Sequence, residues 1–225
     1  MILAIDTSTQ WLSIALYDID NEVFLYEKTW RSSRRHTIEL APAVEEILRD
    51  TQHTTNDLKA VAVATGPGSF TSLRIGLAFA KGMALVNHLD LIGIPSLDIL
   101  AASVPVASVP LICILQAGRK NLAACRYHYT DSWKAEGEPF VITPHELSED
   151  IHAETIICGE MDHEMRKIIG RKWKKALLCS PAVSVRRAST LAELASSRLV
   201  EGLVNDPVQL IPIYLHTSNP IPVID

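Results

Sequence analysis

A strand-to-helix joint at Ala64–Leu77 constrains the fold of this chain more than any other segment. An apolar strand predicted over 61–64 runs into a Gly-Pro-Gly turn at 66–68, and a long helix that is apolar on nearly every side follows. Glycine permits the positive φ angles of a sharp turn. Ser69 is the predicted N-cap, because its hydroxyl can accept a hydrogen bond from a free backbone N–H. The joint therefore either binds a phosphate at the helix N-terminus or simply begins a helix.

The joint lacks the residues of two common phosphate-binding motifs. No lysine follows Gly68 as in a P-loop, and Thr71 stands where a dinucleotide-binding fingerprint has its third glycine. A structural turn and a ligand-binding loop formed by Gly66, Gly68 and Ser69 both remain open at this point.

Hydrophobic periodicity predicts two α/β lobes. In the first half, three short apolar runs separated by turn residues indicate a β-meander, and apolar residues at helical spacing follow it. A segment bracketed by prolines, 105–110, then precedes a second series of strands and helices. We therefore predict one lobe over 1–104 and a second one over 105–225. The predicted strands are 2–6, 12–17, 23–29, 61–65, 91–94, 111–115, 122–129, 140–142 and 155–158, and the predicted helices are 37–49, 70–86, 96–103, 162–169 and 189–204.

The bulk composition favours a packed globular protein that does not grip nucleic acid by itself. Hydrophobic residues make up 48% of the 225 residues, and the net charge is −5. A protein that binds nucleic acid alone needs clustered lysine and arginine to neutralise phosphates. The uncharged stretch 99–118 contains Pro105 and Pro110, so we predict a connector and a strand there rather than a membrane helix. Because no basic and apolar leader opens the sequence, we expect a cytoplasmic protein.

The four cysteines predict buried, reduced thiols. Cys113, Cys125, Cys158 and Cys179 are widely spaced, and none belongs to a C-x-x-C or Cys/His zinc pattern. Their neighbours in the sequence are apolar, and a free cysteine in such surroundings behaves as a small hydrophobic residue. We therefore expect a structural role for them in a reducing compartment.

Several short motifs occur in the order and spacing of one bacterial family. They are Ile2-Leu3-Ala4-Ile5-Asp6-Thr7-Ser8-Thr9, Arg35-His36-Thr37, Gly66-Pro67-Gly68-Ser69-Phe70-Thr71, Leu73-Arg74-Ile75-Gly76, Gly93-Ile94-Pro95-Ser96-Leu97 and Pro212-x-Tyr214-Leu215. In combination they make residues 1–100 similar to the TsaB (YeaZ) family, with a weaker match over 101–225. The resemblance implies the two-lobed α/β fold of actin, sugar kinases and Hsp70 ATPases (the ASKHA fold) with a reduced second lobe. It also implies a non-catalytic subunit of the machinery that makes N6-threonylcarbamoyladenosine at position 37 of tRNA.

The fold implied by the resemblance would place two phosphate-facing hairpins between the lobes. The first would contain Asp6, Thr7, Ser8 and Thr9, and its alternative is an ordinary turn that bonds its own backbone. The second falls at Gln116, a neutral amide where relatives carry an aspartate. Glutamine cannot act as a general base, and it binds magnesium more weakly than a carboxylate does. We therefore expect no catalytic residue and no resident cofactor, with ADP or ATP at a partner interface left open.

The histidines predict no metal site. The resemblance implies that the catalytic paralogue, TsaD, holds its metal with a helix-borne His-x-x-x-His, whose side chains point the same way. This chain has eight histidines and no such pair, since His36 is followed four residues later by Leu40. A single histidine before a helix is usually a capping or surface residue. No G-x-S-x-G of a serine hydrolase is present either.

The helix predicted over 70–86 is the expected partner interface. Its small residues recur every four positions and form a smooth face that a second helix could approach closely. The alternative is a central helix buried under the sheet. Together with the helix over 37–49, such a face suits an isologous dimer or pairing with a paralogue, as the resemblance implies. The expected interface residues are His36, Glu39, Leu40, Leu73, Gly76, Leu77, Ala80, Met83 and Ala84.

Two groups of basic residues have open interpretations. Arg31, Arg34 and Arg35 precede the first helix and could face a partner or a nucleotide phosphate at a subunit junction. A second group is either a solvated helix end or a surface that guides tRNA held mainly by a partner. That group consists of Arg166, Lys167, Arg171, Lys172, Lys174 and Lys175.

The leading hypothesis is a scaffold subunit that pairs through its first lobe with a TsaD-type transferase and helps to recruit a TsaE-type ATPase. Alone it would form a homodimer, and it would meet tRNA only through the complex. Two other classes of function stay open. One is an actin-like small-molecule kinase or ATPase that depends on magnesium and on Asp6, and the other is a homodimeric binding protein with no role on tRNA. A metalloprotease is disfavoured by the missing histidine pair.

Overall fold

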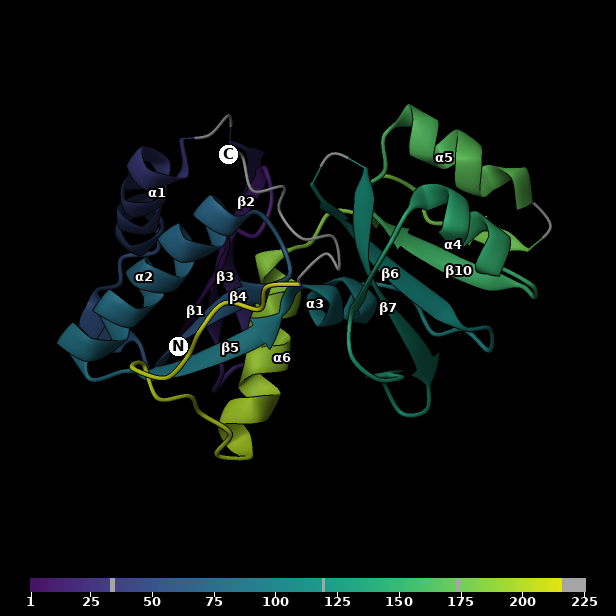
Figure 1. Ribbon diagram of the computed structural model, residues 1–225. Coiled ribbons are helices and arrows are strands. Elements are labelled where there is room, and N and C mark those ends of the chain that lie inside the picture. The colour runs from purple at the N-terminus through teal and green to yellow at the C-terminus, as the bar shows by residue number, and fades with distance from the viewer. Residues whose placement is uncertain (33–34, 119, 173–174, 216–225) are drawn as a thin grey trace, which may run out of the picture.

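The computed structural model describes residues 1–32, 35–118, 120–172 and 175–215. Two α/β lobes lie side by side, each built on its own sheet (Figure 1). The first sheet has the strand order β3-β2-β1-β4-β5. In it, β1, β2 and β3 are antiparallel neighbours, whereas β4 and β5 run parallel to β1. The strands are β1 (Ile2–Asp6), β2 (Trp11–Asp18), β3 (Val23–Arg31), β4 (Ala60–Gly66) and β5 (Asp90–Pro95).

Helices cover both faces of the first sheet. α1 (His36–Asp50) and α2 (Phe70–Asn87) pack on one face, where their apolar side chains meet those of β1, β2 and β4. α3 (Ser96–Ala102) and α6 (Ala188–Val200) pack on the other face. Every residue of β1 and β4 is buried, as is usual for strands that are covered on both sides.

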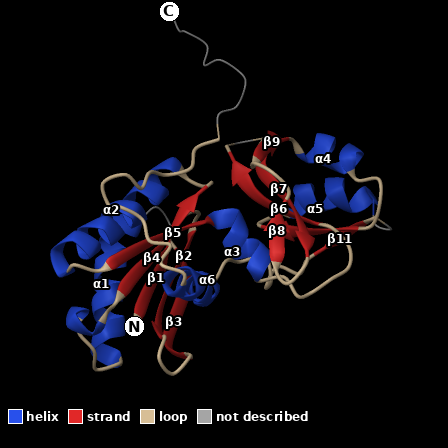
Figure 2. Cartoon of the chain, turned by 90° about the horizontal axis from the view of Figure 1, so that it is seen from below, coloured by secondary structure: helices blue, strands red, loops and turns tan. Residues whose placement is uncertain are grey.

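The second sheet has the strand order β11-β10-β6-β7-β8, and β9 also pairs with β7. α4 (Pro144–Asp150) and α5 (His163–Ile169) cover its outer face (Figure 2). α3 packs against its inner face, so this short helix lies between the two lobes. The strands are β6 (Leu111–Ala117), β7 (Asn121–Tyr129), β8 (Trp133–Ala135), β9 (Phe140–Ile142), β10 (Thr155–Gly159) and β11 (Ala176–Leu178), and short 3₁₀ helices lie at Thr55–Asp57 and Gly170–Lys172.

The two sheets share one topology. In the first sheet, β1 pairs antiparallel with β2 and parallel with β4, and β5 lies parallel beside β4 at the edge. In the second sheet, β6 pairs antiparallel with β7 and parallel with β10, and β11 lies parallel beside β10 at the edge. The helices of the second lobe are shorter, with seven residues in α4 and in α5 against 15 in α1 and 18 in α2. This duplication confirms the predicted fold class, an actin-like two-lobed α/β fold with a reduced second lobe.

The C-terminal part of the chain returns to the first lobe. We predicted a simple division into 1–104 and 105–225, but α6 packs against β1, β2 and β5. Its buried residues Ala188, Leu191, Ala192 and Ala195 join the apolar cluster of the first sheet. The segment after α6 also follows β5, since Asn205 pairs with Leu91. The first lobe therefore contains residues from both ends of the sequence, which a linear reading of periodicity cannot reveal.

Three short elements were missed in the sequence. β8 and β11 have three residues each, too few to display a period. α4 did carry a signal, because Thr143 and Glu146 form a capping box around Pro144 at its first turn. α6 ends at Val200, four residues before its predicted end.

The N-cap predicted at Ser69 lacks the expected side-chain hydrogen bond, and Ser96 at the start of α3 is no cap either. Ser69 occupies the N-cap position of α2, but its hydroxyl bonds no helical N–H. Its Oγ instead accepts a hydrogen bond from Ser72 Oγ at 3.0 Å, and its own N–H donates to the carbonyl of Ser8. Ser96 is the first residue of α3 rather than its cap. The buried Ser96 hydroxyl has no partner within the described part of the chain.

The stretch 99–118 divides, as predicted, into the end of α3, a connector and β6. Among the described residues, none of the helices combines the length and the hydropathy that a bilayer crossing requires.

Cys113, Cys125 and Cys158 are buried free thiols, as predicted, whereas Cys179 is only half-buried.

Candidate functional site

The loop between β1 and β2 is buried and bonds its own backbone. Asp6 is 1% exposed, and its Oδ1 accepts hydrogen bonds from the backbone N–H and the hydroxyl of Ser8, at 2.8 and 2.5 Å. Thr7 Oγ1 donates to the carbonyl of Ser72 in α2 at 2.7 Å. His36 Nε2 lies 3.0 Å from the carbonyl oxygen of Thr9. α1, through His36, and α2, through Ser72, therefore both hold this loop in place.

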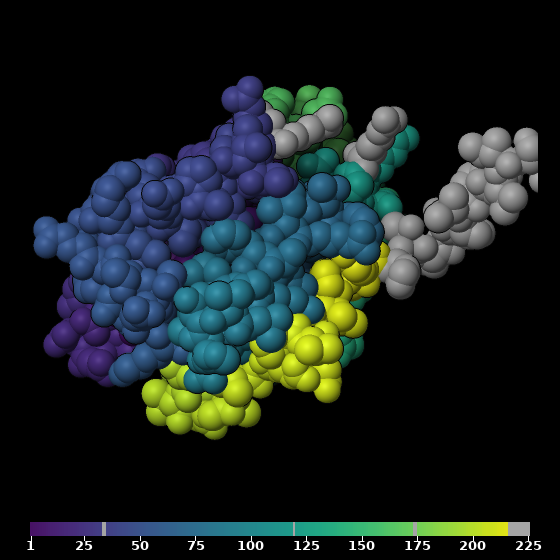
Figure 3. All heavy atoms as spheres, turned by 90° about the vertical axis from the view of Figure 1, so that its left-hand side faces the viewer, coloured from purple at the N-terminus to yellow at the C-terminus, as the bar shows by residue number. Residues whose placement is uncertain are grey.

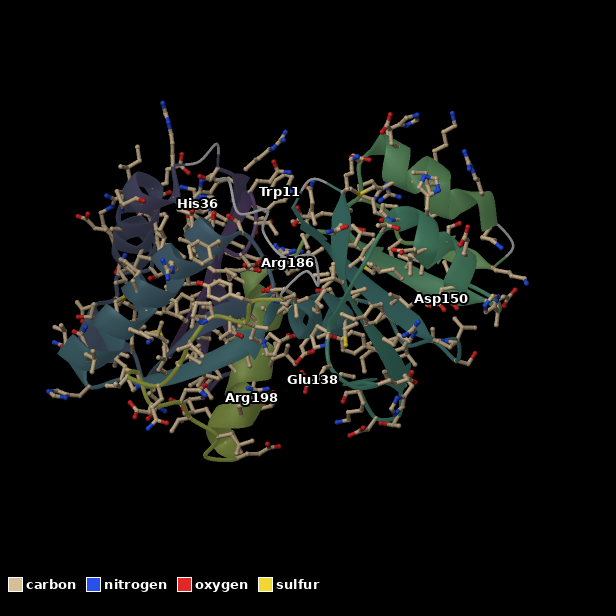
Figure 4. All side chains as sticks on the ribbon, viewed as in Figure 1. Trp11, His36, Glu138, Asp150, Arg186 and Arg198 are labelled. Carbon is tan, nitrogen blue, oxygen red and sulfur yellow. The ribbon has the colours of Figure 1, made fainter. Side chains whose placement is uncertain are left out.

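A buried guanidinium joins this loop to the second lobe. Arg186, just before α6, is 1% exposed, and its Nε lies 2.9 Å from Asp6 Oδ2. Its Nη1 lies 2.9 Å from Glu160 Oε1, next to the end of β10, and its Nη2 lies 2.8 Å from Thr9 Oγ1. The Thr9 hydroxyl in turn donates to Glu160 at 2.8 Å. Figure 4 shows Arg186 between the two lobes.

The charges of this network explain why Arg186 can be buried. Burial alone would lower the pKa of Arg186, but the Asp6 and Glu160 carboxylates outweigh it and raise that pKa above its ordinary value. Buried ions are tolerated only when they are paired and hydrogen-bonded. The Asp6 carboxylate accepts three hydrogen bonds, from Ser8 and Arg186, so both of its oxygens are engaged.

Two glycines let the loop approach α2 closely. A Cβ added at Gly68 would lie 2.2 Å from the carbonyl oxygen of Ser8, and one added at Gly76 would lie 2.2 Å from Thr7 Oγ1. We expected Gly66 and Gly68 to supply positive φ angles, and only Gly66 does so, with φ of 110°. Glycine is therefore required at positions 68 and 76 because a Cβ would clash there, and at position 66 because its φ angle is positive.

Gly76→Ala is expected to lower the free energy of unfolding by about 1–3 kcal/mol, because Thr7 would have to move from its bond to α2. Gly82→Ala, in the same helix, is the matched control. A Cβ at Gly82 meets no atom within 4 Å, so this change should stabilise the helix by about 0.5–1 kcal/mol. Urea unfolding measures both variants. A Gly76→Ala protein as stable as the wild type would contradict this packing.

An apolar groove of about 500 Å³ lies between α1 and α2. The two helices form one outer face of the first lobe (Figure 3). At this face, Phe70 is 53% exposed and Ile38 is 66% exposed. Exposed apolar side chains beside an apolar groove are typical of interaction sites on soluble proteins. The groove is lined by Thr37, Leu40, Ala41, Phe70, Thr71, Arg74, Ile75, Ala78 and Phe79.

The C-terminal segment packs against two residues that line the groove, Phe70 and Arg74. The Arg74 guanidinium lies 4.2 Å from the centre of the Phe70 ring, and the Tyr214 ring lies 4.9 Å from that ring. Arg74 Nε donates to the Tyr214 hydroxyl at 3.2 Å. The N–H of Ile213 donates to the carbonyl of Thr65 at 2.7 Å, which fixes the segment against β4. The tyrosine of the Pro-x-Tyr-Leu motif thus packs against Phe70 and Arg74, two residues that line the groove.

The structure brings the nine predicted interface residues together on α1 and α2 but buries most of them within the chain. Glu39 and Met83 are half-buried. The small-residue face of α2 is turned inward, where Gly76 meets the first loop, and the outward face carries Thr71, Arg74 and Ala78. The buried residues are His36, Leu40, Leu73, Gly76, Leu77, Ala80 and Ala84. A partner that approached this site would therefore meet their exposed neighbours first.

The two basic groups lie at the surface. Arg31 and Arg35 are exposed, and Arg31 Nε donates to Gln10 Oε1 at 2.9 Å. Arg34 and Lys174 lie outside the described residues. Lys167, Arg171 and Lys175 are exposed, and Lys172 is half-buried. Their contacts with a partner or with RNA stay predictions.

Glu160 and Arg186 were missed in the sequence. They lie 151 and 180 positions from their partners Thr9 and Asp6, so no local pattern connects them. The available hint was Asp6 itself, since an aspartate at the end of a buried strand needs a partner.

Gln116 is exposed at the end of β6. Within the described ranges, no three His, Cys, Asp or Glu side chains converge as metal ligands do.

Comparisons with known proteins identify the family. A family model described as "TsaD: tRNA N6-adenosine threonylcarbamoyltransferase" matches residues 30–216. The "tRNA threonylcarbamoyladenosine biosynthesis protein TsaB" of Escherichia coli is 30% identical over 165 residues, which cover 70% of each chain. The protein of the same name from Bacillus subtilis is 38% identical over 102 residues, covering 45% of this chain and 44% of that one. The protein of the same name from Buchnera aphidicola (Schizaphis graminum) is 36% identical over 101 residues, so the chain spans about half (47%) of the length of that relative.

A solved structure shows the same fold along nearly the whole chain. YeaZ from Pseudomonas aeruginosa matches with a TM-score of 0.80 at 23% identity, covering 95% of this chain and 99% of that one. The motifs of the first lobe, the duplicated topology and the match over 30–216 agree with one another. The chain belongs to the TsaB (YeaZ) branch of the TsaD family.

Proposed function

We propose that this chain is the scaffold subunit of the machinery that makes N6-threonylcarbamoyladenosine in tRNA. It would pair through the outer face of α1 and α2 with a TsaD-type transferase and help to recruit a TsaE-type ATPase. Contact with tRNA would be indirect, through the complex. The names of the TsaB relatives support the pathway. The apolar groove between α1 and α2 is the observation that carries the pairing.

The chemistry of the groove suits a protein partner. Phe70, Phe79 and Arg74 line it, and aromatic residues and arginine are enriched at the energetic centres of interfaces. A paralogue of the same fold would present equivalent helices, so the two pairs could pack about a pseudo-two-fold axis. In the absence of that paralogue, a second copy of this chain would occupy the same face and give a homodimer.

The network around Asp6 supports a role without catalysis. Asp6 is buried and accepts three hydrogen bonds from Ser8 and Arg186. A general base or a magnesium ligand needs a free carboxylate oxygen facing its substrate or ion. Gln116, at the position of the second hairpin, has no carboxylate to offer. Activation of the partner would then come from holding it in its active arrangement.

The proposal predicts that the isolated chain neither binds nor hydrolyses ATP in the space between its lobes. Titration calorimetry with ADP, and with ATP plus magnesium, should give no saturable heat up to about 1 mM ligand. The same titration on the complex with the transferase would reveal a nucleotide held at the subunit junction. Magnesium-dependent ATP turnover by the isolated chain, abolished in Asp6→Ala, would favour the kinase or ATPase alternative instead.

Reconstituted tRNA modification tests the function itself. The transferase, the ATPase and the enzyme that supplies the threonylcarbamoyl donor are mixed with unmodified tRNA, with or without this chain. The modified nucleoside is then measured by mass spectrometry after digestion. We expect the initial rate to fall at least about tenfold without this chain, a loss of about 1.4 kcal/mol in transition-state stabilisation. A full rate in its absence would overturn the scaffold role and favour a homodimeric protein with no role on tRNA.

A further inference from the structure

The four cysteines of the second lobe form one row across four neighbouring strands. Cys125 of β7 lies opposite Cys113 of β6, and Cys113 lies opposite Cys158 of β10. The N–H of Cys179, directly after β11, donates to the carbonyl of Ile157 at 2.9 Å, which continues the β10–β11 register and places Cys179 beside Cys158. All four belong to the apolar cluster between the second sheet and α3.

The four thiols differ in their access to solvent. Cys113, Cys125 and Cys158 are buried. Cys179 is half-buried and lines an apolar pocket of about 540 Å³. The other walls of this pocket are the connector 104–107 and residues of β10 and β11. A small uncharged reagent from solvent therefore meets Cys179 first and Cys158 behind it.

The surroundings of Cys179 favour its thiolate. The neighbouring Cys158 thiol lowers the pKa of Cys179, burial opposes this, and the positive charge of Arg166 lowers the pKa further. Both terminal nitrogens of Arg166 lie 3.2 Å from the Cys179 carbonyl oxygen, which fixes the guanidinium nearby. The nearby Cys179, together with burial, raises the pKa of Cys158, whose thiol donates to the carbonyl oxygen of Val183 at 3.7 Å. The thiolate is the reactive form of cysteine, so Cys179 is the nucleophile of this pair.

We propose that Cys179 and Cys158 form a thiol pair that small hydroperoxides oxidise reversibly to a disulfide. The Cys179 sulfur attacks one peroxide oxygen, the O–O bond breaks, and a sulfenic acid forms while the other oxygen leaves as water or an alcohol. The Cys158 sulfur then attacks the sulfenic sulfur, the S–O bond breaks, and the S–S bond forms with release of one water. Two thiols lose two electrons in total, and one peroxide gains them.

The backbone geometry fits such a bond. Neighbouring strands lie about 4.7–4.9 Å apart, and disulfides join Cα atoms about 4.4–6.8 Å apart. Cys113 also lies beside Cys158, but it is fully buried and lines no part of the pocket. The bond therefore forms between the two strands at the edge of the sheet, and Cys113 and Cys125 stay reduced.

Peptide mapping of the full chain tests the proposal, because trypsin separates the four cysteines. They fall in the tryptic peptides 82–119, 121–126, 135–166 and 176–186. After exposure to hydrogen peroxide and blocking of free thiols, we expect peptides 135–166 and 176–186 to be linked, about 2 Da below their summed mass and separable by a reductant. Before oxidation, Cys179 should react with iodoacetamide about tenfold or more faster than Cys125. Four free thiols after peroxide, or a link between other cysteines, would overturn the proposal.

Single variants separate the roles of the two thiols. In Cys158→Ala, the Cys179 sulfenic acid has no resolving thiol and should be trapped by dimedone on peptide 176–186. In Cys179→Ala, peptide 135–166 should stay free of any link. Cys125→Ala is the matched control, a buried cysteine of the same row in which the link should form as in the wild type. Dimedone on peptide 135–166 rather than 176–186 would reverse the assigned roles and contradict the proposal.

Discussion

Replacing Arg186 with alanine is expected to lower the free energy of unfolding by about 3–5 kcal/mol. The guanidinium is buried and pairs with Asp6 of the first lobe and Glu160 of the second. Its removal leaves the Asp6 carboxylate buried without a cation and breaks a direct polar connection between the lobes. Urea unfolding followed by circular dichroism gives the difference in free energy, and the urea dependence shows whether both lobes still unfold together.

The neighbouring arginine is the matched control for this change. Arg187 pairs with Glu27, but its side chain is 61% exposed. Solvent around the Arg187 guanidinium screens this pair, although the Glu27 side chain is only 13% exposed, so Arg187→Ala should cost less than Arg186→Ala. Equal losses in the two variants would mean that the buried network between the lobes adds nothing beyond an ordinary surface pair.

Ala78→Arg is expected to weaken binding to the TsaD-type transferase by at least about 30-fold, or 2 kcal/mol. Ala78 is exposed on α2 and lines the groove. An arginine there fills the space that a partner side chain would enter, and its charge would be buried without a counter-ion. Because position 78 is exposed and arginine is a good helix former, the variant should keep the wild-type stability. Biolayer interferometry with immobilised transferase measures the dissociation constant.

Ser197→Arg is the matched control for the interface. Ser197 is exposed on α6, which packs on the opposite face of the same sheet. The Ser197→Arg change adds the same charge to a helix of the same lobe. It should leave the affinity for the transferase unchanged within about twofold. If Ala78→Arg bound as tightly as Ser197→Arg, the groove would not be the contact surface.

Local patterns predicted most elements of the fold. β1 spans residues 2–6 as expected, and α1 extends the predicted helix 37–49 by one residue at each end. Such elements are specified by periodicity and turn residues within a short window. The return of α6 to the first lobe is a long-range event, and the local sequence of α6 does not indicate which sheet its buried residues cover.

The site was predictable in its parts but not in its connections. The Asp6–Thr9 loop and the Gly-Pro-Gly turn meet each other, as the N–H of Ser69 donates to Ser8. Their partner Arg186 comes from the far end of the sequence, and no pattern near it singles it out. For α2, the helix is apolar on nearly every side, so periodicity could not decide which face turns inward. Packing against Thr7 decides it, because only a glycine fits at position 76.

Hydrogen exchange of this chain, measured by mass spectrometry with and without the TsaD-type transferase, tests the central claim most directly. The account predicts slower exchange in peptides from α1 and α2, residues 36–50 and 70–87, when the transferase is present. Peptides from α4 and α5, on the outer face of the second lobe, should exchange at the same rate in both samples. Slower exchange confined to the second lobe, or no change anywhere at concentrations at which the transferase is active, would contradict pairing through the α1–α2 face.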